Sequence, residues 1–448
     1  MIELCALSAS EAAEGIRDGR FSARDLVEAS LARIDAMESA VGAWVYLDAE
    51  HALKQAARAD EAHAEGRSLG PLHGVPVGIK DIIDTFDMPT EDGTPLHAGR
   101  APSADATIVQ RLRSAGAIIL GKTVTSEMAT FSPGKTRNPH NPAHTPGGSS
   151  SGSAAAVAAG MVPLAIGTQT NGSIIRPASY CGVMGFKPSR GLLSRTGILR
   201  LSPSLDQPGV VARTVDDLAL ATEIMAGADG IDTSLRATAH LPLRRVAGSA
   251  PPFSPKLALV RTPFWSETDA ALRSGFEELA EALGECAVEF TLPASAVDVL
   301  QWHKRIMEAE MAAHLVAEYD RGHDALSTSL RGQLEAGRAV RAVDYLDAKA
   351  RIDIVTAGLD DLFDEFDALL TPAALGAAPA GLESTGDPKM CTLWSYCGMP
   401  AVSLPLLRDH AGMPIGVQLV GRCFDDARLL RTARWLWQFV ARNGEVSA

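Results

Sequence analysis

The stretch TPGGSSSGSAAAVAAGMVPLAIGTQTNGSIIR, residues 145–176, decides the fold of this 448-residue chain. Its run AAAVAA at 154–159 carries no charge, which is typical of a helix that is buried on all sides. The apolar run MVPLAIGT at 161–168 follows at once and is typical of a buried strand. A small-residue helix followed directly by a strand indicates the interior of an α/β protein.

The same alternation extends outward from this stretch. Strands are expected at 74–80 (GVPVGIK) and 117–122 (AIILGK), with helical periodicity at 106–116 between them. A helical pattern near 214–227 closes this block. The pattern predicts a sheet with helices packed against it.

Strand-like and helix-like segments resume toward the C-terminus. Strand-like runs stand at 256–262, 368–375, 401–407 and 414–420, long helical patterns at 267–283, 298–320 and 338–365, and a last helix from Asp425. The late strands have no helices of their own, so we expect them to join the sheet begun near residue 76.

The fold class predicted is therefore α/β, a single large domain with a mixed central β-sheet covered by helices on both faces. Within residues 1–448 we expect an N-terminal helical segment (1–65), a core block (66–227), a variable helical cover (228–390), and C-terminal strands and a helix that return to the sheet (391–448).

Composition excludes several classes of protein. Charged residues at 21% and hydrophobic residues at 46% exclude a largely disordered chain. No apolar run reaches the roughly 18 to 20 residues that a membrane span needs. The net charge of -13 argues against nucleic acid as a partner of the isolated chain. The six cysteines lack zinc-ligand spacing and the N-terminus lacks signal-peptide character, so buried thiols and a cytoplasmic location are expected.

Two short patterns match known motifs but lack the required context. GAIILGKT at 116–123 fits the phosphate-binding loop rule, yet residues 117–120 indicate a buried strand instead of a loop. GSSSG at 148–152 fits the nucleophile elbow, yet the strand that should precede it would carry the three prolines of 138–146. An α/β-hydrolase esterase stays open as an alternative, because His residues lie downstream.

A tight loop after the strand at 161–168 places Ser173 where a nucleophile can be exposed. The backbone N–H groups of Thr170, Asn171, Gly172 and Ser173 are free to form an oxyanion hole there. A flexible Gly/Ser linker is the alternative interpretation of the residues before the helix.

These residues belong to a longer block of motifs. The motifs are HGVPVGIKD (73–81), GKTVTSEMA (121–129), the Gly/Ser run, CGVMGFKPSRG (181–191) and SPSLDQPGVVARTVDDLA (202–219). Together they resemble the amidase signature family over about a third of the chain, in the variant found in small-amide hydrolases of the malonamidase type. GMPAVSLPL and GMPIGVQLV near the C-terminus are similar too.

The resemblance implies a Ser-Ser-Lys triad and the amidase signature fold. The catalytic lysine falls on Lys80, the bridging serine on Ser149 and the nucleophile on Ser173, with a non-proline cis peptide before the bridging serine. The family needs no metal and no organic cofactor. Lys80 can act as a base only when neutral, so its pKa must fall from about 10.4 toward about 7 to 8, most simply by burial. Asp81 would oppose this shift, but it points to the other face of its strand.

The chain departs from the family pattern around the nucleophile. The usual Asp is Gln169 and the usual Arg is displaced by one residue to Arg176, changes that fit together because losing one partner of a buried ion pair costs more than losing both. Asn171 stands for a second glycine and tolerates left-handed backbone angles. Arg176 either binds a substrate carboxylate or bonds backbone carbonyls of the loop. His140 and His144 are discounted as a metal site.

The function predicted is an amidase that hydrolyses a small-molecule amide through a serine acyl-enzyme, with Ser150 and Arg176 contacting the substrate. The alternative within the family is the glutamine-hydrolysing A subunit of a tRNA-dependent amidotransferase, which needs partner chains. A catalytically silent family member used for binding is a further alternative. For partners we expect the amide substrate and no membrane, with a homodimer left open.

Overall fold

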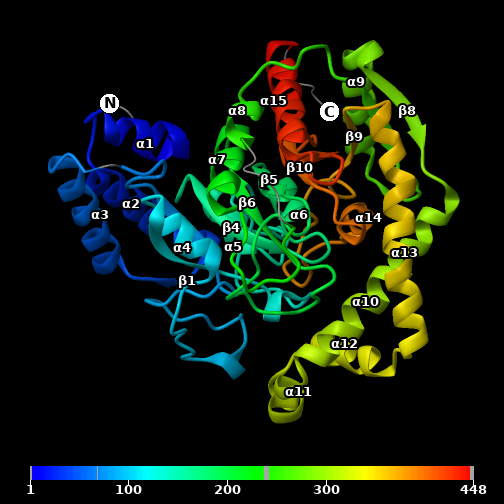
Figure 1. Cartoon of the computed structure of the whole chain (residues 1–448), viewed down its shortest axis with the longest axis horizontal. Helices are drawn as coiled ribbons and strands as arrows, with labels where there is room; N and C mark the ends of the chain where they lie inside the picture. The colour runs from blue at the N-terminus through cyan, green and yellow to red at the C-terminus, as the bar shows by residue number, and fades with distance from the viewer. Residues whose placement is uncertain (1–2, 68, 237–241, 444–448) are drawn as a thin grey trace.

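The computed structural model describes residues 3–67, 69–236 and 242–443, and within them eleven strands form one mixed sheet (Figure 1). The strands are β1 (Trp44–Leu47), β2 (Pro76–Lys80), β3 (Ile118–Thr123), β4 (Leu164–Gln169), β5 (Met184–Lys187), β6 (Gln207–Ala212), β7 (Leu257–Arg261), β8 (Ala287–Thr291), β9 (Ala368–Pro372), β10 (Ala401–Arg408) and β11 (Pro414–Val420). Their order across the sheet is β1-β3-β2-β4-β6-β5-β10-β11-β9-β7-β8.

Fifteen α-helices of the described ranges surround the sheet and cover both of its faces (Figure 1). They are α1 (Ala9–Arg17), α2 (Ala23–Val41), α3 (Ala49–Ala64), α4 (Thr107–Ser114), α5 (Ser151–Ala158), α6 (Ile175–Cys181), α7 (Val215–Met225), α8 (Leu243–Ala247), α9 (Ala270–Leu283), α10 (Val299–His314), α11 (Val316–Gly322), α12 (Thr328–Ala339), α13 (Ala342–Asp360), α14 (Lys389–Cys397) and α15 (Asp426–Asn443). The predicted fold class is confirmed. None of these helices combines the length and hydropathy needed to cross a bilayer.

The C-terminal strands lie in the middle of the sheet. β10 pairs with β5 on one side, and β11 pairs with β9 on the other, all antiparallel. The late strands therefore lie in the same sheet as the first block. The segment 228–390, which the sequence presents as a helical cover, contributes three strands (β7, β8 and β9) in addition to its helices.

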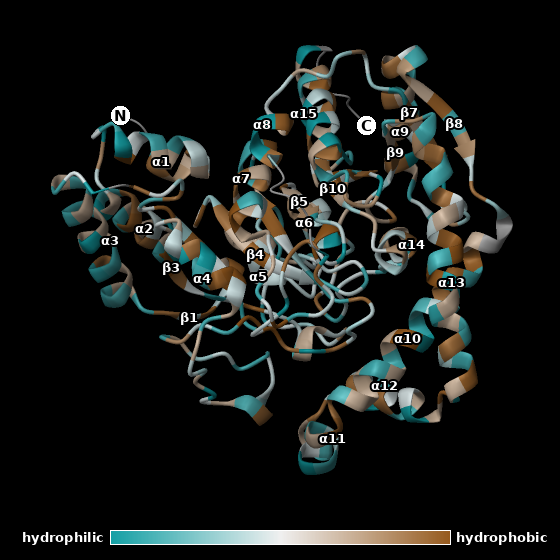
Figure 2. Ribbon diagram, viewed as in Figure 1, coloured by the Kyte–Doolittle hydropathy of each residue, from teal (hydrophilic) through white to brown (hydrophobic). Residues whose placement is uncertain are grey.

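Small residues let two helices approach the sheet closely. Every residue of α5 from 151 to 157 is buried, as its uncharged alanine run predicts. A Cβ at Gly185 would lie 2.6 Å from Ala178 of α6, and one at Gly416 would lie 2.7 Å from Ser179 of the same helix. Figure 2 shows hydrophobic residues along the central strands and hydrophilic residues on outer helices such as α3 and α11.

The parallel neighbours β2 and β4 bring Lys80 and the loop that carries Ser173 to one edge of the sheet. Their register pairs Ile79 with Ile166, so both strands end at the same edge of the sheet. Lys80 is the last residue of β2, and the loop after β4 leads into α6. β3, which carries most of the rejected phosphate-loop motif, is a fully buried strand, as the sequence predicts.

Candidate active site

Lys80 and Ser149 are in direct contact at this edge. The Lys80 Nζ lies 2.8 Å from the Ser149 Oγ and 2.8 Å from the Thr168 Oγ1, and the lysine is fully buried. The Gly148–Ser149 peptide bond is cis, as the resemblance implies. A buried amine held against a serine hydroxyl can take its proton, provided that the amine is neutral.

Burial lowers the pKa of Lys80 well below its usual value, and the carboxylate of Asp206 opposes this shift. Asp81 does not hold the Lys80 amine charged by an ion pair, because its carboxylate lies 3.4 Å from the Nζ of Lys122, on β3. A neutral amine is expected of a lysine that is buried and has no carboxylate partner of its own. Lys80 meets both conditions.

Ser173 lies in the loop between β4 and α6 and lines a narrow cavity together with Asn171, Gly172 and Arg176. Ser173 is about nine-tenths buried, with 9% of its surface exposed. The Ser150 N–H donates to the Ser173 carbonyl at 3.3 Å, which holds the serine run beside this loop. The segments that carry Lys80, Ser149 and Ser173 therefore converge on one place.

Two side chains anchor the carbonyl groups of the loop before Ser173. The Nε2 of His303, on α10, lies 3.1 Å from the Thr170 carbonyl, and the Ser395 hydroxyl, on α14, donates to the Asn171 carbonyl. In a trans peptide the N–H points away from the C=O, so these anchors direct the N–H groups of Asn171 and Gly172 to the opposite side. Neither N–H has a hydrogen-bond partner among the described residues. Such a pair of free donors can stabilise an oxyanion.

Asn171 and Gln169 fit the loop for reasons that differ from the sequence-based ones. Asn171 does not adopt a left-handed backbone conformation; its side chain accepts a hydrogen bond from Thr392 at 2.8 Å. The Oε1 of Gln169 accepts from the N–H groups of Ile174 and Ile175, and its Nε2 donates to Ser395 at 3.0 Å. A neutral amide therefore ties the loop to α6 and α14 without a charged partner.

Arg176 bonds backbone carbonyls, which is one of its two predicted alternatives. Its Nε donates to the Thr385 carbonyl at 2.7 Å, and its Nη2 donates to the Gly148 carbonyl at 2.7 Å. Its Nη1 is buried and has no hydrogen-bond partner, and the side chain lines the cavity beside Ser173. Asp387, a carboxylate whose charge acts on this guanidinium, is paired with the Nζ of Lys389 at 3.0 Å instead. An unpaired, buried guanidinium N–H is costly unless a ligand pairs with it.

Two other sequence-based predictions meet a different environment. The Ser150 hydroxyl donates to the Thr168 carbonyl at 3.1 Å and accepts from the Thr168 N–H, and Ser150 is absent from the lining of the Ser173 cavity. The structure therefore gives its hydroxyl a backbone-positioning role in place of a substrate contact. The discounted residues His140 and His144 bond the backbone carbonyls of Cys181 and Ala378.

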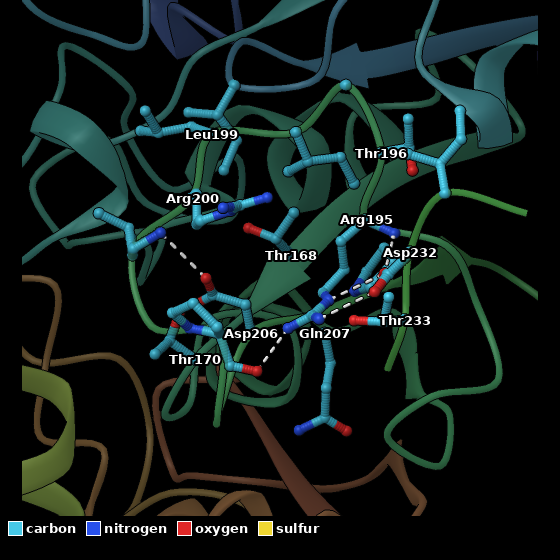
Figure 3. A pocket seen from close by; sticks show the side chains of 17 residues that line it. Thr168, Thr170, Arg195, Thr196, Leu199, Arg200, Asp206, Gln207, Asp232 and Thr233 are labelled. Carbon is cyan, nitrogen blue, oxygen red and sulfur yellow. Dashed lines mark hydrogen bonds and ion pairs between the residues drawn. The ribbon is translucent and has the colours of Figure 1, made fainter. Parts of the chain in front are cut away.

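A second cavity of about 330 Å³ lies behind Thr168. Figure 3 shows Thr168, Thr170 and Asp206 among its lining residues, with the Arg195–Asp232 ion pair across from them. Asp206 accepts from the Thr170 hydroxyl at 2.7 Å, and burial raises the pKa of its carboxyl to about 6. Asp206 is thus the carboxylate whose field reaches Lys80.

Sequence reasoning missed four residues that shape this site: Thr168, Asp206, His303 and Ser395. Asp206 lies within the quoted motif SPSLDQPGVVARTVDDLA, and its position between a Leu and the strand-like QPGVVA was the available signal. His303 and Ser395 come from helices far along the chain, and no local pattern links them to the loop they contact.

Several known proteins are similar to this chain in sequence and in fold. A family model described as Amidase matches residues 25–430. The A subunit of the glutamyl-tRNA(Gln) amidotransferase of Chloroflexus aggregans is 36% identical over 96% of each chain. The structure of a vestigial protein complex, described as revealing the evolutionary origins of an s-triazine catabolic enzyme, matches with a TM-score of 0.91 at 30% identity, covering 98% of this chain and 99% of that one. The peptide amidase of Stenotrophomonas maltophilia matches with a TM-score of 0.86 at 28% identity, covering 97% and 96%.

These findings correct the first functional prediction. The sequence predicted an amidase that hydrolyses a small-molecule amide on its own. Curated relatives that cover nearly the whole chain are instead named as the A subunit of glutamyl-tRNA(Gln) amidotransferase, including one of Symbiobacterium thermophilum at 34% identity over 95% of each chain. The small-amide hydrolase is therefore wrong as the main prediction, and the alternative that the sequence left open, the amidotransferase A subunit, is better supported.

Proposed function

Because the chain belongs to the amidase family, we propose that it is the glutamine-hydrolysing A subunit of a tRNA-dependent amidotransferase. It is a hydrolase that acts on carbon–nitrogen bonds. In the proposed reaction it cleaves the side-chain amide of glutamine to glutamate and ammonia, and partner subunits use the ammonia. The names of its curated relatives support this assignment.

We assign the acylation step to Lys80, Ser149 and Ser173. The neutral Nζ of Lys80 takes the Ser149 proton, and Ser149 takes the Ser173 proton as the Ser173 Oγ attacks the amide carbon. The carbonyl π electrons move to oxygen, giving a tetrahedral oxyanion. When it collapses, the C–N bond breaks, and the leaving nitrogen receives a proton through Ser149 to depart as ammonia.

The remaining steps reuse the same groups. The N–H groups of Asn171 and Gly172 stabilise the oxyanion because the carbonyls of the same two peptide units, those of Thr170 and Asn171, are anchored by His303 and Ser395. Water then attacks the acyl-enzyme, gives one proton to the Ser149–Lys80 relay and releases glutamate, while Ser173 regains its proton from the relay. The charge develops only in the transition state, so prepositioned donors lower the barrier without needing to move.

Arg176 supplies the proposed contact to the substrate's α-carboxylate. Its unpaired Nη1 lies in the lining of the cavity that holds Ser173, and a guanidinium N–H to a carboxylate is a strong, charge-assisted hydrogen bond. Glutamine carries a carboxylate at one end and the scissile amide at the other, as this arrangement requires.

The proposal depends above all on one contact: the fully buried Nζ of Lys80 lies 2.8 Å from the Ser149 hydroxyl. The next residue after Ser149, Ser150, bonds the Ser173 carbonyl. The test measures ammonia release from glutamine by the purified chain, alone and with the other amidotransferase subunits and glutamyl-tRNA from the same organism. We expect turnover that rises with the partners and is lost in Ser173→Ala and Lys80→Ala.

A matched control comes from the same serine run. The Ser151 hydroxyl bonds only the Val124 carbonyl, so Ser151→Ala should stay within about twofold of the parent enzyme. Absence of glutamine hydrolysis in the full set of subunits would overturn the proposed function. Full activity in Lys80→Ala would overturn the role of the lysine.

A further inference from the structure

The cavity beside Ser173 contains two buried polar atoms that lack partners. One is the Nη1 of Arg176, a donor, and the other is the Oε1 of Gln333, an acceptor on α12. A buried polar atom without a partner destabilises the empty cavity, so both atoms favour a ligand that offers an acceptor and a donor at the same time.

The orientation of the Gln333 amide follows from its other contacts. Its nitrogen donates to the Ser329 carbonyl and to the Ser329 hydroxyl, both at 3.2 Å. A backbone carbonyl can only accept, so the nitrogen must be the atom on that side. The amide oxygen is thereby left as the unpaired acceptor.

Two other acceptors near this cavity, the carboxylates of Glu308 and Asp387, each have a lysine as ion-pair partner. A wider cavity shares Gln333 and Asn171 with the first one and is also lined by Glu308 and Asp387. The Nζ of Lys304 lies 3.8 Å from the Glu308 carboxylate, and the Nζ of Lys389 lies 3.0 Å from that of Asp387. The Gln333 oxygen is thus the acceptor in this group that still needs a donor.

We propose that Gln333 is a specificity-determining residue whose Oε1 accepts a hydrogen bond from the α-ammonium group of the substrate, while the Arg176 Nη1 binds its α-carboxylate. This inference rests on the proposed function and extends it, because it names the residue that separates an α-amino acid amide from a plain carboxylate-bearing amide. Gln333 acts on binding and takes no part in proton transfer.

The test compares two ligands that differ only in the ammonium group. L-glutamine and glutaramate, its analogue without the amino group, are titrated by calorimetry into Ser173→Ala protein, which cannot turn them over. Gln333→Met keeps side-chain volume and removes the acceptor. We expect it to weaken glutamine binding about tenfold or more and to leave glutaramate within about twofold, since a hydrogen bond to a charged group is lost only for glutamine.

Two further variants complete the design. Arg176→Met should weaken both ligands alike, because both carry the carboxylate. Gln110→Met, the same change on α4 where the amide bonds only the Asp105 carbonyl, should alter neither. Unchanged glutaramate binding also verifies that Gln333→Met is folded.

The outcomes separate this inference from the proposed function. Three results would overturn the inference. They are equal effects of Gln333→Met on both ligands, no effect of Gln333→Met on glutamine binding, and no binding of glutamine to the Ser173→Ala protein that retains Gln333. Ammonia release by the Ser173-containing enzyme reports on the function independently. If the enzyme hydrolyses glutamine but Gln333→Met keeps the parent affinity for glutamine, the proposed function stands and the role of Gln333 is refuted.

Discussion

Replacing His303 with Leu tests whether the geometry of the oxyanion loop is set from α10. His303 is buried, and its Nε2 must carry the proton that bonds the Thr170 carbonyl, since that carbonyl can only accept. Burial lowers the pKa of His303 to about 4, so the ring stays neutral and keeps this donor throughout the physiological range. Leu fills much of the space but donates nothing.

The size of the effect follows from the contact that is lost. A buried carbonyl without its partner costs about 1–3 kcal/mol, and the loop can recover that energy only by turning the peptide away from the oxyanion. If the whole cost appears in the transition state, kcat falls by roughly 5- to 150-fold. Complete loss of one oxyanion donor, about 100- to 1,000-fold, sets the upper limit.

The assay is steady-state ammonia release from glutamine at pH 8, with kcat and KM determined separately. We expect a fall in kcat with little change in KM, because Thr170 does not bind the ground state. His314→Leu, the same change at the exposed end of α10, serves as the control. A folded His303→Leu enzyme with kcat within twofold of the parent would refute the anchoring argument.

Three further changes probe the same structure. Because only neutral Lys80 accepts a proton, kcat/KM should fall as pH drops through the pKa of Lys80, and Asp206→Asn should move this limb to lower pH by removing the carboxylate that raises that pKa; a limb that stays in place contradicts the assignment. Ser395→Ala should lower kcat roughly 5- to 100-fold through loss of the second loop anchor, and an unchanged kcat would argue against it. Burial lowers the pKa of Lys187 from 10.5 to about 7, so the unfolded chain binds the extra proton between these pH values, and stability rises with pH. The free energy of unfolding of the parent relative to Lys187→Met should thus increase by about 1.4 kcal/mol per pH unit between pH 7 and 9 in denaturant titrations, and a constant difference would contradict it.

Much of the sheet near the site could be predicted from local pattern. β2, β3 and β4 are runs of buried residues with clear ends, and short apolar strands next to helical periods are the strongest local signal of an α/β core. The buried alanine helix α5 was equally clear. Edge strands were not: β1 has four residues and β8 alternates poorly between exposed and buried positions.

The site residues divide in the same way. Lys80, Ser149 and Ser173 stand in motifs that resemble the amidase signature family, and that resemblance identifies them. The structure brings Lys80 and Ser149 into contact. His303 and Gln333 lie on helices whose periodicity shows only that one face is buried, not which loop that face meets. The choice between a free-standing amidase and an amidotransferase component could not come from the motif block, because that block resembles both. Comparison of the whole chain was needed to correct it.

Because β10 and β11 lie in the middle of the sheet but come last in the chain, the sheet can be completed only late in synthesis. Strands β1–β6 and strands β7–β9 have no ladder with each other; each group joins the sheet only through this C-terminal hairpin. A nascent chain therefore holds two unfinished half-sheets with open edges until residues up to Val420 have been made, a state in which unpaired strands invite association with other chains. The last tenth of the polypeptide thus closes the sheet that holds both halves together.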